Sequence, residues 1–251
     1  MEKTQKSKER EGGVRIGGLC YFDGTLGEAI TTVLPYALAH TPFAVFTPGA
    51  TVAACALRDK DLLSVLSRGD LLLPDGKGIC LAARIVGEGR VDRIAGIDFA
   101  EALLAVSAPY RIRVFLYGGK AGVAERATAR LREKYPHLLL SSADGYGADP
   151  SERIARFRPH VVAVCLGAGK QEAWILKNKD RIGGLHIGLG GSLDVWAGDK
   201  RRAPRLLRRV GLEWAWRTLL EPRRIFRLLP LPRYFLYCLS VRQSAKKRDE
   251  K

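Results

Sequence analysis

The sequence predicts an α/β fold: a Rossmann-like, mostly parallel sheet with helices on both faces, followed by a C-terminal helical appendage. Short apolar runs alternate with helical patterns in a repeated strand-then-helix order, which is typical of parallel sheets. This alternation stops near Gly198, beyond which Arg, Trp and Leu recur at helical spacing between prolines. With 251 residues, 47% of them hydrophobic, the chain is long enough for one full-sized core. We therefore expect a single α/β body with a short helical extension.

The expected strands are continuous apolar runs, a pattern typical of strands buried on both faces of a sheet. Their ranges are Arg15–Leu19, Phe43–Thr47, Leu71–Pro74, Val114–Tyr117, Leu138–Ser141, Val161–Leu166 and His186–Leu189. The expected helices lie between them, where apolar residues recur at the helical period. Their ranges are Thr25–Ala39, Thr51–Leu57, Lys60–Ser67, Lys77–Val86, Asp98–Ser107, Gly122–Lys134, Pro150–Arg156, Lys170–Lys179 and Ser192–Ala197.

The two ends of the chain are polar and charged, which is typical of disordered tails. We expect a disordered tail at 1–13, the α/β body at 14–198, a basic helical appendage at 199–240 and a second disordered tail at 241–251. The apolar helix at Ala29–Ala39 either belongs to the core or forms a subunit contact in a homo-oligomer. No secretory signal and no run of the roughly 18 apolar residues that span a bilayer is recognised. We therefore expect a cytoplasmic protein.

The charge is strongly basic and uneven. The formal net charge is +16, and the segment 199–251 alone carries 16 Lys or Arg against 5 Asp or Glu. This balance indicates an anionic partner, and a nucleic acid, an anionic membrane surface or a phosphorylated small molecule would each fit. For the run Lys246–Arg248, a solvated surface is the favoured interpretation.

Several classes of site are not indicated. The five cysteines are scattered, without a paired spacing, so we expect no zinc site and a reducing compartment. The four histidines lie in or beside hydrophobic segments, which gives no support to a Ser-His-Asp or Cys-His mechanism. The P-loop, the dinucleotide fingerprint and the Gly-x-Ser-x-Gly elbow are not recognised. We therefore expect no cofactor and no bound metal.

Polar, glycine-rich clusters follow the expected strands. They are Thr47–Gly49, Pro74–Gly76, Gly118–Lys120, Gly167–Glu172 and Gly188–Asp194. Because open α/β sheets bind ligands at the carboxyl ends of their strands, these clusters can jointly build a pocket. Glycines permit close backbone approach, and helix N-termini suit phosphates. The clusters therefore favour a nucleotide-type ligand.

Asp75 is the strongest single candidate for catalysis. It follows the apolar run Leu71–Leu73, so its carboxylate would lie at the floor of the pocket, where it can act as a general base toward a hydroxyl. Pro-Asp-Gly is also a common turn sequence, so a purely structural turn explains the same residues. The loop at Gly167–Glu172 carries a cation, an amide and a carboxylate in succession, and its alternative is a glycine turn before a solvated helix start.

In the appendage, Arg residues alternate with large apolar residues, as in 213–217 and 221–227. Arg forks suit diphosphate oxygens, and Trp, Phe and Leu suit the headgroup region of a membrane. A nucleic-acid binder would show similar interleaving. Here, however, the basic cluster is terminal and attached to a sheet whose loops suggest a small-molecule pocket, so we expect no nucleic-acid partner.

A series of short motifs runs in order from about Phe43 to Arg227. They are Thr47-Pro48, Pro74-Asp75-Gly76, Asp92-Arg93-Ile94-Ala95-Gly96, Leu116-Tyr117-Gly118-Gly119, Asp144-Gly145-Tyr146, Gly167 with Lys170-Gln171-Glu172, Gly190-Gly191-Ser192-Leu193-Asp194, Ala197-Gly198, Arg202-Ala203-Pro204, and Gly211-Leu212-Glu213-Trp214 with Glu221-Pro222-Arg223-Arg224. Each motif is weak alone, but together they resemble the WecG/TagA/CpsF glycosyltransferase family, glycosyltransferase family 26.

The resemblance implies a metal-independent, inverting transfer of an N-acetylmannosamine-type sugar from a UDP-sugar donor. The implied acceptor is a polyprenyl-diphosphate-linked amino sugar at the inner membrane face, in teichoic acid or other cell-surface polysaccharide synthesis. Asp75 is the implied general base, with Thr47 and Gln171 in the catalytic pocket. The appendage is implied to close the site, to supply Arg to the diphosphates and to hold the protein peripherally on an anionic membrane. The expected substrate-binding residues are Gly49, Arg93, Gly118, Gly119, Tyr146, Gly167, Lys170, Glu172, Gly190, Gly191, Asp194, Arg202, Arg217, Arg223, Arg224 and Arg227.

Two positions depart from the family pattern. The family usually has Asn where this chain has Gly49, and Pro where it has Gly169. Loss of the Asn amide removes hydrogen-bonding groups from the pocket and would alter the choice of sugar or weaken catalysis, whereas Gly169 only frees the backbone. The alternative from a different class is a non-catalytic basic module that binds anionic lipid or nucleic acid, in which both glycines mark a decayed site.

Overall fold

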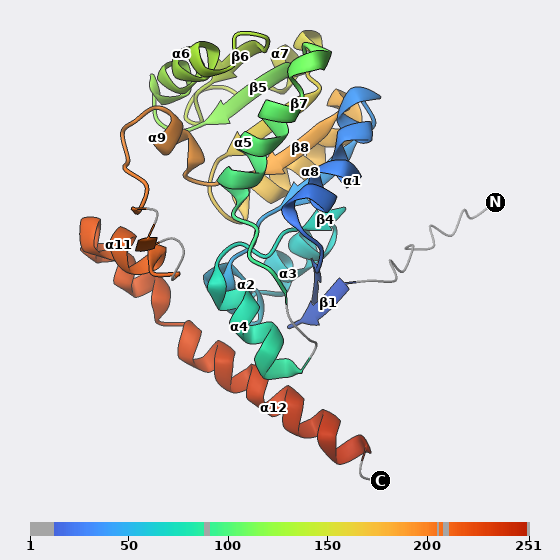
Figure 1. Ribbon diagram of the computed structural model, residues 1–251, viewed down its shortest axis with the longest axis vertical. Coiled ribbons are helices and arrows are strands. Elements are labelled where there is room, and N and C mark those ends of the chain that lie inside the picture. Colours follow the sequence, from blue (N-terminus) through green and yellow to red (C-terminus); the bar gives the residue numbers. More distant parts are fainter. Residues whose placement is uncertain (1–12, 88–90, 205, 208–210, 250–251) are drawn as a thin grey trace, which may run out of the picture.

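The computed structural model describes residues 13–87, 91–204, 206–207 and 211–249. Its centre is a six-stranded sheet with the strand order β4-β3-β8-β7-β5-β6, in which every neighbouring pair is parallel. The strands are β3 (Phe43–Phe46), β4 (Leu71–Leu72), β5 (Arg113–Gly118), β6 (Leu139–Ala143), β7 (Val161–Cys165) and β8 (Leu185–Gly188). The predicted parallel α/β fold is confirmed (Figure 1).

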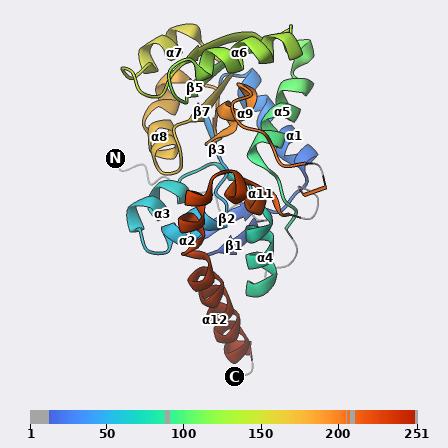
Figure 2. The same ribbon diagram turned by 90° about the vertical axis from the view of Figure 1, so that its left-hand side faces the viewer.

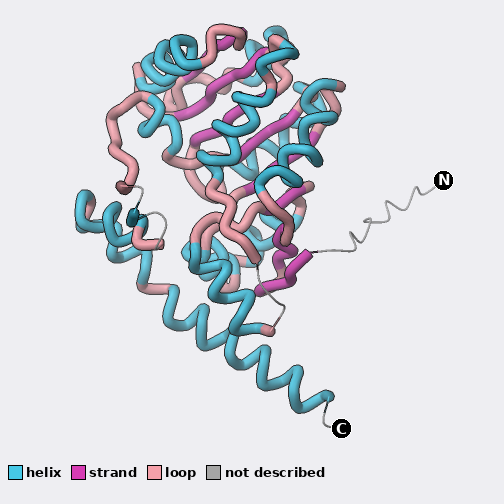
Figure 3. Tube along the Cα trace, in the orientation of Figure 1, coloured by secondary structure: helices cyan, strands magenta, loops and turns pink. Residues whose placement is uncertain are grey.

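Successive residues of a strand point to opposite faces, so the buried sheet carries a core on each side. Val45 and Leu116 belong to one core, and their neighbours Phe46 and Phe115 belong to the other. Helices α1 (Leu26–Leu38), α5 (Gly96–Val106), α6 (Val123–Lys134) and α9 (Ser192–Trp196) complete the first core. Helices α2 (Ala50–Ala56), α3 (Lys60–Ser67), α4 (Lys77–Val86), α7 (Ser151–Phe157) and α8 (Lys170–Ile182) complete the second. Figure 3 shows the strands inside this shell of helices.

The beginning of the described chain differs from the prediction. Instead of one strand at 15–19, an antiparallel pair is formed by β1 (Gly13–Ile16) and β2 (Leu19–Phe22), which make a separate small sheet. Gly17 and Gly18 join them with positive φ angles of 60° and 84°, the backbone that two-residue hairpin turns require. Residues 1–12 of the predicted tail lie outside the described residues, and Gly13 already belongs to β1.

The appendage consists of α11 (Glu213–Leu220), the 3₁₀ helix η2 (Pro222–Leu228) and the long helix α12 (Leu231–Asp249). Helix α12 packs against α2 and α4 and then extends away from the body (Figures 1 and 2). Its buried Tyr234 and Cys238 join the same core as Tyr21 of β2. The prediction of a disordered tail from 241 differs from this helix, which continues to Asp249. Segment 241–249 contains no Gly or Pro and several strong helix formers, so it propagates a helix that is already docked upstream.

Among the helices that the structure describes, none is both long enough and apolar enough to cross a bilayer.

His186, on central strand β8, makes the fold sensitive to acid. Its side chain is fully buried. This burial, opposed by the Gly184 carbonyl and aided by the charge of Lys179, lowers the pKa of the imidazole to about 4. Because the folded-state pKa lies below the unfolded value, stability is lost as pH falls from about 6.5 toward 4. We expect the titration of His186 alone to lower the free energy of unfolding by about 2 kcal/mol at pH 5.

Urea unfolding at pH 7 and pH 5 tests this expectation. The His186→Leu protein should lose about 2 kcal/mol less than the parent protein between the two pH values. Val106→Leu, at an exposed position of α5 that carries no ionisable group, is the control and should leave the pH dependence as it is in the parent. An equal loss in the parent and the His186→Leu protein would contradict the assignment.

Candidate active site

A cavity of about 640 Å³ opens at the carboxyl ends of β3, β4 and β8 and is closed on one side by the appendage. These three strands are neighbours in the sheet, so the loops that follow them meet at one edge, where open α/β sheets bind ligands. Body residues in the lining include Thr47, Pro48, Gly49, Val52, Asp75, Lys77, Leu81, Arg93, Gln171, Glu172, Gly190 and Gly191. Appendage residues in the lining are Gly211, Glu213, Trp214, Leu228, Leu231 and Phe235.

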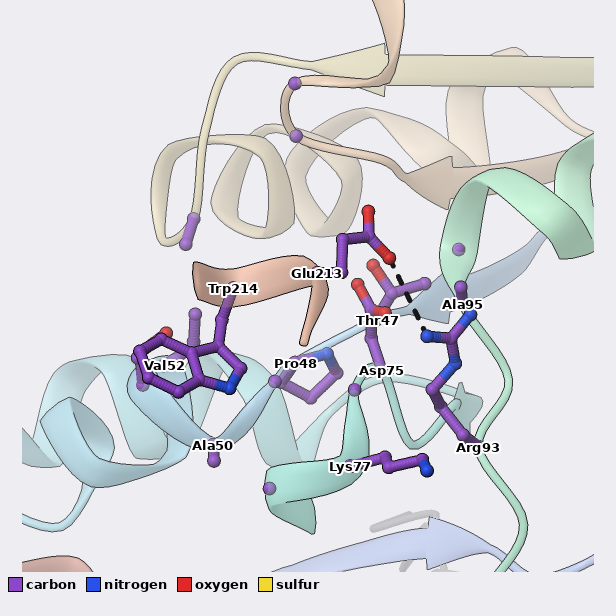
Figure 4. Close-up of a pocket in the computed structure, with 18 of the residues that line it drawn as sticks. Thr47, Pro48, Ala50, Val52, Asp75, Lys77, Arg93, Ala95, Glu213 and Trp214 are labelled. Carbon is purple, nitrogen blue, oxygen red and sulfur yellow. Dashed lines mark ion pairs between the residues drawn. The ribbon is translucent and has the colours of Figure 1, made fainter. Parts of the chain in front are cut away.

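Thr47 and Asp75 lie at the floor of this cavity. Thr47 follows β3, and its hydroxyl donates a 2.8 Å hydrogen bond to the carbonyl of Gly188 at the end of β8. Asp75 follows the short strand β4 in a tight turn, in which its amide donates to the Leu73 carbonyl at 2.9 Å. Figure 4 shows the two side chains beside each other, near Glu213 and Arg93. The strand ends therefore bring a hydroxyl and a carboxylate to one place, as the sequence predicts.

Gly49 permits a close approach between the loops after β3 and β4. A Cβ atom at this position would lie 2.9 Å from the carbonyl oxygen of Asp75, closer than van der Waals contact allows. The absence of a side chain at position 49 therefore lets the Asp75 turn pack directly against the N-terminus of α2.

Gln171 and Glu172 brace two loops together at the start of α8. The Gln171 amide nitrogen donates to Glu172 Oε1 at 2.8 Å, and Gln171 Oε1 accepts from the Gly190 amide at 2.9 Å. Glu172 Oε2 accepts from the Gly169 amide at 2.6 Å. Burial raises the pKa of the Glu172 carboxyl, while the hydrogen bonds from Gln171 and Gly169 act in the opposite direction. These bonds fix the loop after β7 to the loop after β8.

Arg93 links the body to the appendage. Its guanidinium lies 3.4 Å from Asp98 on α5 and 3.6 Å from Glu213 on α11. Asp98 in turn pairs with Arg202 at 2.7 Å. All four side chains are largely buried, which strengthens ion pairs relative to exposed ones. The network holds Glu213 over the cavity.

The cavity gathers eight of the residues predicted for the site: Thr47, Gly49, Asp75, Arg93, Gln171, Glu172, Gly190 and Gly191. Other predicted residues lie outside its described lining: Gly118, Gly119, Tyr146, Gly167, Lys170, Asp194, Arg202, Arg223 and Arg227. Tyr146 is 79% exposed, and Asp194 pairs with Lys200 at 3.0 Å. The side chains of Arg217 and Arg224 lie outside the described part of the structure. The substrate roles of these residues stay predictions.

Several residues that line the cavity have no role predicted from the sequence. Lys77 could have been predicted as a site residue, because it directly follows Pro74-Asp75-Gly76 at the start of α4. In the structure, its aliphatic stem packs against Gly211 of the appendage. Glu213 and Trp214 belong to the motif Gly211-Leu212-Glu213-Trp214, which carries the family resemblance but predicts no role for either residue. No sequence pattern predicts that Leu228, Leu231 and Phe235 line a cavity, because apolar residues at helical spacing are equally typical of core packing.

Comparisons with known proteins identify the family of this chain. The family model for the glycosyl transferase WecG/TagA/CpsF family matches residues 14–249. A relative from Bacillus subtilis (strain 168) is 34% identical over 231 residues, which are 90% of this chain and 84% of the relative. A relative from Bacillus spizizenii is 33% identical over 208 residues, 81% of each chain. A Staphylococcus aureus (strain NCTC 8325) relative is 29% identical over 208 residues, 81% of this chain and 82% of the relative.

All three relatives are named N-acetylglucosaminyldiphosphoundecaprenol N-acetyl-beta-D-mannosaminyltransferase. The family model covers nearly the whole chain, body and appendage alike. The resemblance found in the sequence is therefore confirmed, and the chain belongs to the WecG/TagA/CpsF family of glycosyl transferases.

Proposed function

We propose that this enzyme transfers an N-acetylmannosamine-type sugar from a UDP-sugar to a polyprenyl-diphosphate-linked amino sugar. The reaction inverts the anomeric configuration, needs no metal ion and serves teichoic acid or other cell-surface polysaccharide synthesis. The observation that carries this proposal is the Asp75 carboxylate at the floor of a cavity shared by the sheet edge and the appendage. The names of the relatives support the sugar and the lipid-linked acceptor.

The proposed mechanism is a single displacement. Asp75 takes the proton of the attacking acceptor hydroxyl as its oxygen forms a bond to the anomeric carbon. The bond from that carbon to the diphosphate breaks, and UDP leaves with the bonding electrons, so the configuration inverts. Lys77 and Arg93 line the cavity and stabilise the charge that develops on the diphosphate. The exposed Arg223 and Arg227 remain predicted contacts of the diphosphates from the appendage side.

The full-length protein should be assayed for transfer from radiolabelled UDP-sugars to N-acetylglucosamine linked to a lipid diphosphate. Product formation from UDP-N-acetylmannosamine in the presence of EDTA, with the opposite anomeric configuration to the donor, is the expected result. Transfer with retention, or transfer that chelation abolishes, would overturn the mechanism. A protein that binds anionic lipid or RNA but transfers no sugar would support the non-catalytic alternative.

Because Gly49 packs closely against Asp75, adding a single methyl group at position 49 is expected to lower catalytic activity. In the Gly49→Ala protein the Asp75 turn must move, because the new Cβ would lie 2.9 Å from its carbonyl oxygen. Small misplacements of a catalytic group are costly, so we expect kcat to fall at least about tenfold while the protein remains folded. Gly27→Ala, in the first turn of α1, is the control and should keep full activity. Unchanged kcat in the Gly49→Ala protein would show that this contact does not position Asp75.

We also propose that the appendage holds the enzyme peripherally on the inner face of the cell membrane. Its large apolar side chains are unusually exposed and lie beside the exposed Arg223 and Arg227; they include Leu219, Leu220, Ile225, Phe226 and Leu229. Such side chains enter the headgroup region, and each well-placed basic residue adds about 1 kcal/mol of attraction to an anionic leaflet. The association is therefore reversible and weakened by salt.

Flotation with anionic liposomes tests the membrane proposal. Replacing both Phe226 and Leu229 by Ser should reduce the bound fraction, with at least about a tenfold loss in partitioning. Leu139→Ser, at a half-exposed site on β6 of the body, is the control and should float like the parent. Equal flotation of all three proteins would place the membrane contact elsewhere.

A further inference from the structure

The wall that the appendage contributes to the cavity is mainly apolar. The sequence predicts that the appendage brings Arg side chains to the site, yet its described lining residues are Trp214, Leu228, Leu231 and Phe235, together with Gly211 and Glu213. From the body, the cavity lining adds the apolar Val52 and Leu81, which lie on α2 and α4, the two helices that α12 packs against. This wall, called the apolar wall below, comprises Val52, Leu81, Trp214, Leu228, Leu231 and Phe235.

The packing of α12 fixes the apolar wall in place. Leu231 and Phe235 are four residues apart and share one face of the helix. Tyr234 and Cys238, next to this face, are buried in the core, and α12 packs along both α2 and α4. The part of the wall that α12, α2 and α4 contribute is therefore built on helices packed against one another.

Polarity changes sharply across the cavity. The floor carries Thr47, Asp75 and Gln171, whereas the apolar wall offers only hydrocarbon and an indole ring. Sugar hydroxyls or phosphates placed against this wall would lose their hydration and find only the indole N–H of Trp214 as a partner, which is unfavourable. Trp214 is 55% exposed and Leu81 is 48% exposed, so the wall reaches from the interior of the cavity to the surface. A ligand that fits this cavity has a polar end, which reacts at the floor, and a hydrocarbon chain, which lies along the apolar wall toward the surface.

We propose that the apolar wall binds the first isoprene units of the acceptor lipid, so that the enzyme recognises the proximal hydrocarbon as well as the sugar and the diphosphate. This inference rests on the proposed function, which supplies a prenyl-linked acceptor. The wall then orients the acceptor so that its sugar enters the polar floor beside Asp75. It acts independently of the exposed appendage residues that meet the membrane.

Short, water-soluble acceptors separate this role from membrane binding. N-acetylglucosamine diphosphate esterified to methyl, geranyl or farnesyl groups should be compared without membrane or detergent, by calorimetric binding and by kcat/KM. The parent protein is expected to bind the farnesyl compound at least about tenfold more tightly than the methyl compound, since burial of a few methylene groups has this effect. Phe235→Ser and Trp214→Ala should each remove most of this preference and leave the KM for the UDP-sugar unchanged.

The matched control is Leu236→Ser, adjacent to Phe235 on α12 but 64% exposed and outside the cavity lining. It should keep the farnesyl preference. Equal affinity for methyl and farnesyl compounds in the parent protein would overturn the inference while leaving transfer intact. A raised KM for the UDP-sugar in the Phe235→Ser protein, with the farnesyl preference retained, would assign the wall to the donor and also overturn it. A farnesyl preference without any sugar transfer would uphold the wall and reject the proposed function.

The Trp214→Ala variant keeps the test decisive if Phe235→Ser reduces folding, because Trp214 is half exposed and contributes little to the core. Thermal unfolding of each variant identifies any loss of the folded state before binding is compared.

Discussion

The Asp75→Asn protein is expected to lose about 10²- to 10⁴-fold in kcat for sugar transfer, the range typical of removing a general base. Asn has the same shape as Asp and still forms hydrogen bonds, but it cannot accept the proton of the acceptor hydroxyl. Because Asp75 lies at the cavity floor beside Thr47, the loss should appear in the chemical step and leave the KM for the UDP-sugar near its parent value. Single-turnover measurements with saturating acceptor separate that step from product release.

Asp61→Asn is a suitable control, since Asp61 is an exposed residue in the first turn of α3. This protein should retain the parent kcat. If the Asp75→Asn protein also retained full activity, the proton would have to go to another group, and the proposed mechanism would fail.

Replacing Gly118 by Ala is expected to destabilise the fold by about 3 kcal/mol or more. Gly118 ends β5 with a φ of +132°, and a Cβ there would lie 2.3 Å from the carbonyl oxygen of Cys165 on the neighbouring strand β7. In the Gly118→Ala protein, the Ala backbone is strained at this φ angle, and the new Cβ also pushes β7 away. Both effects lower the free energy of unfolding. Urea unfolding measures the effect directly as a lower midpoint.

Gly147→Ala is the comparison for Gly118→Ala, because a Cβ at position 147 meets nothing closer than 3.5 Å. It should change stability by less than about 1 kcal/mol. The family resemblance implies a substrate-binding role for Gly118. A Gly118→Ala protein of unchanged stability that no longer binds UDP would favour that role over the packing role.

The sequence predicted the parts of the site that depend on chain direction. Parallel strands carry their following loops to one edge, so Thr47 after β3, Asp75 after β4 and Gly190 after β8 could be expected to meet. Five strands of the main sheet follow continuous apolar runs such as Val161–Cys165, which are typical of strands buried on both faces. The sixth, the edge strand β6, is only partly buried. These features follow from local pattern and the rules of α/β topology.

Features that depend on packing between distant segments were not predictable. Gly118 and Gly190 look alike in sequence, but Gly118 lets strands β5 and β7 approach closely, whereas Gly190 lines the cavity. Phe235 shows the same helical pattern as a core residue, and its place in the cavity follows only from the docking of α12 on α2 and α4. Its neighbour Leu236 points outward. Helix α12 likewise extends past the predicted boundary at 240 because tertiary contacts upstream stabilise its start.

A crystal structure of the Asp75→Asn protein with a UDP-sugar and a prenyl-linked acceptor tests the central claim most directly, because the slow variant should hold both substrates. The account predicts that the sugar of the donor occupies the cavity, with the acceptor hydroxyl within hydrogen-bond distance of the side chain at position 75 and on the opposite side of the anomeric carbon from the diphosphate. A donor bound outside this cavity, or an anomeric carbon beyond the reach of position 75, would contradict it.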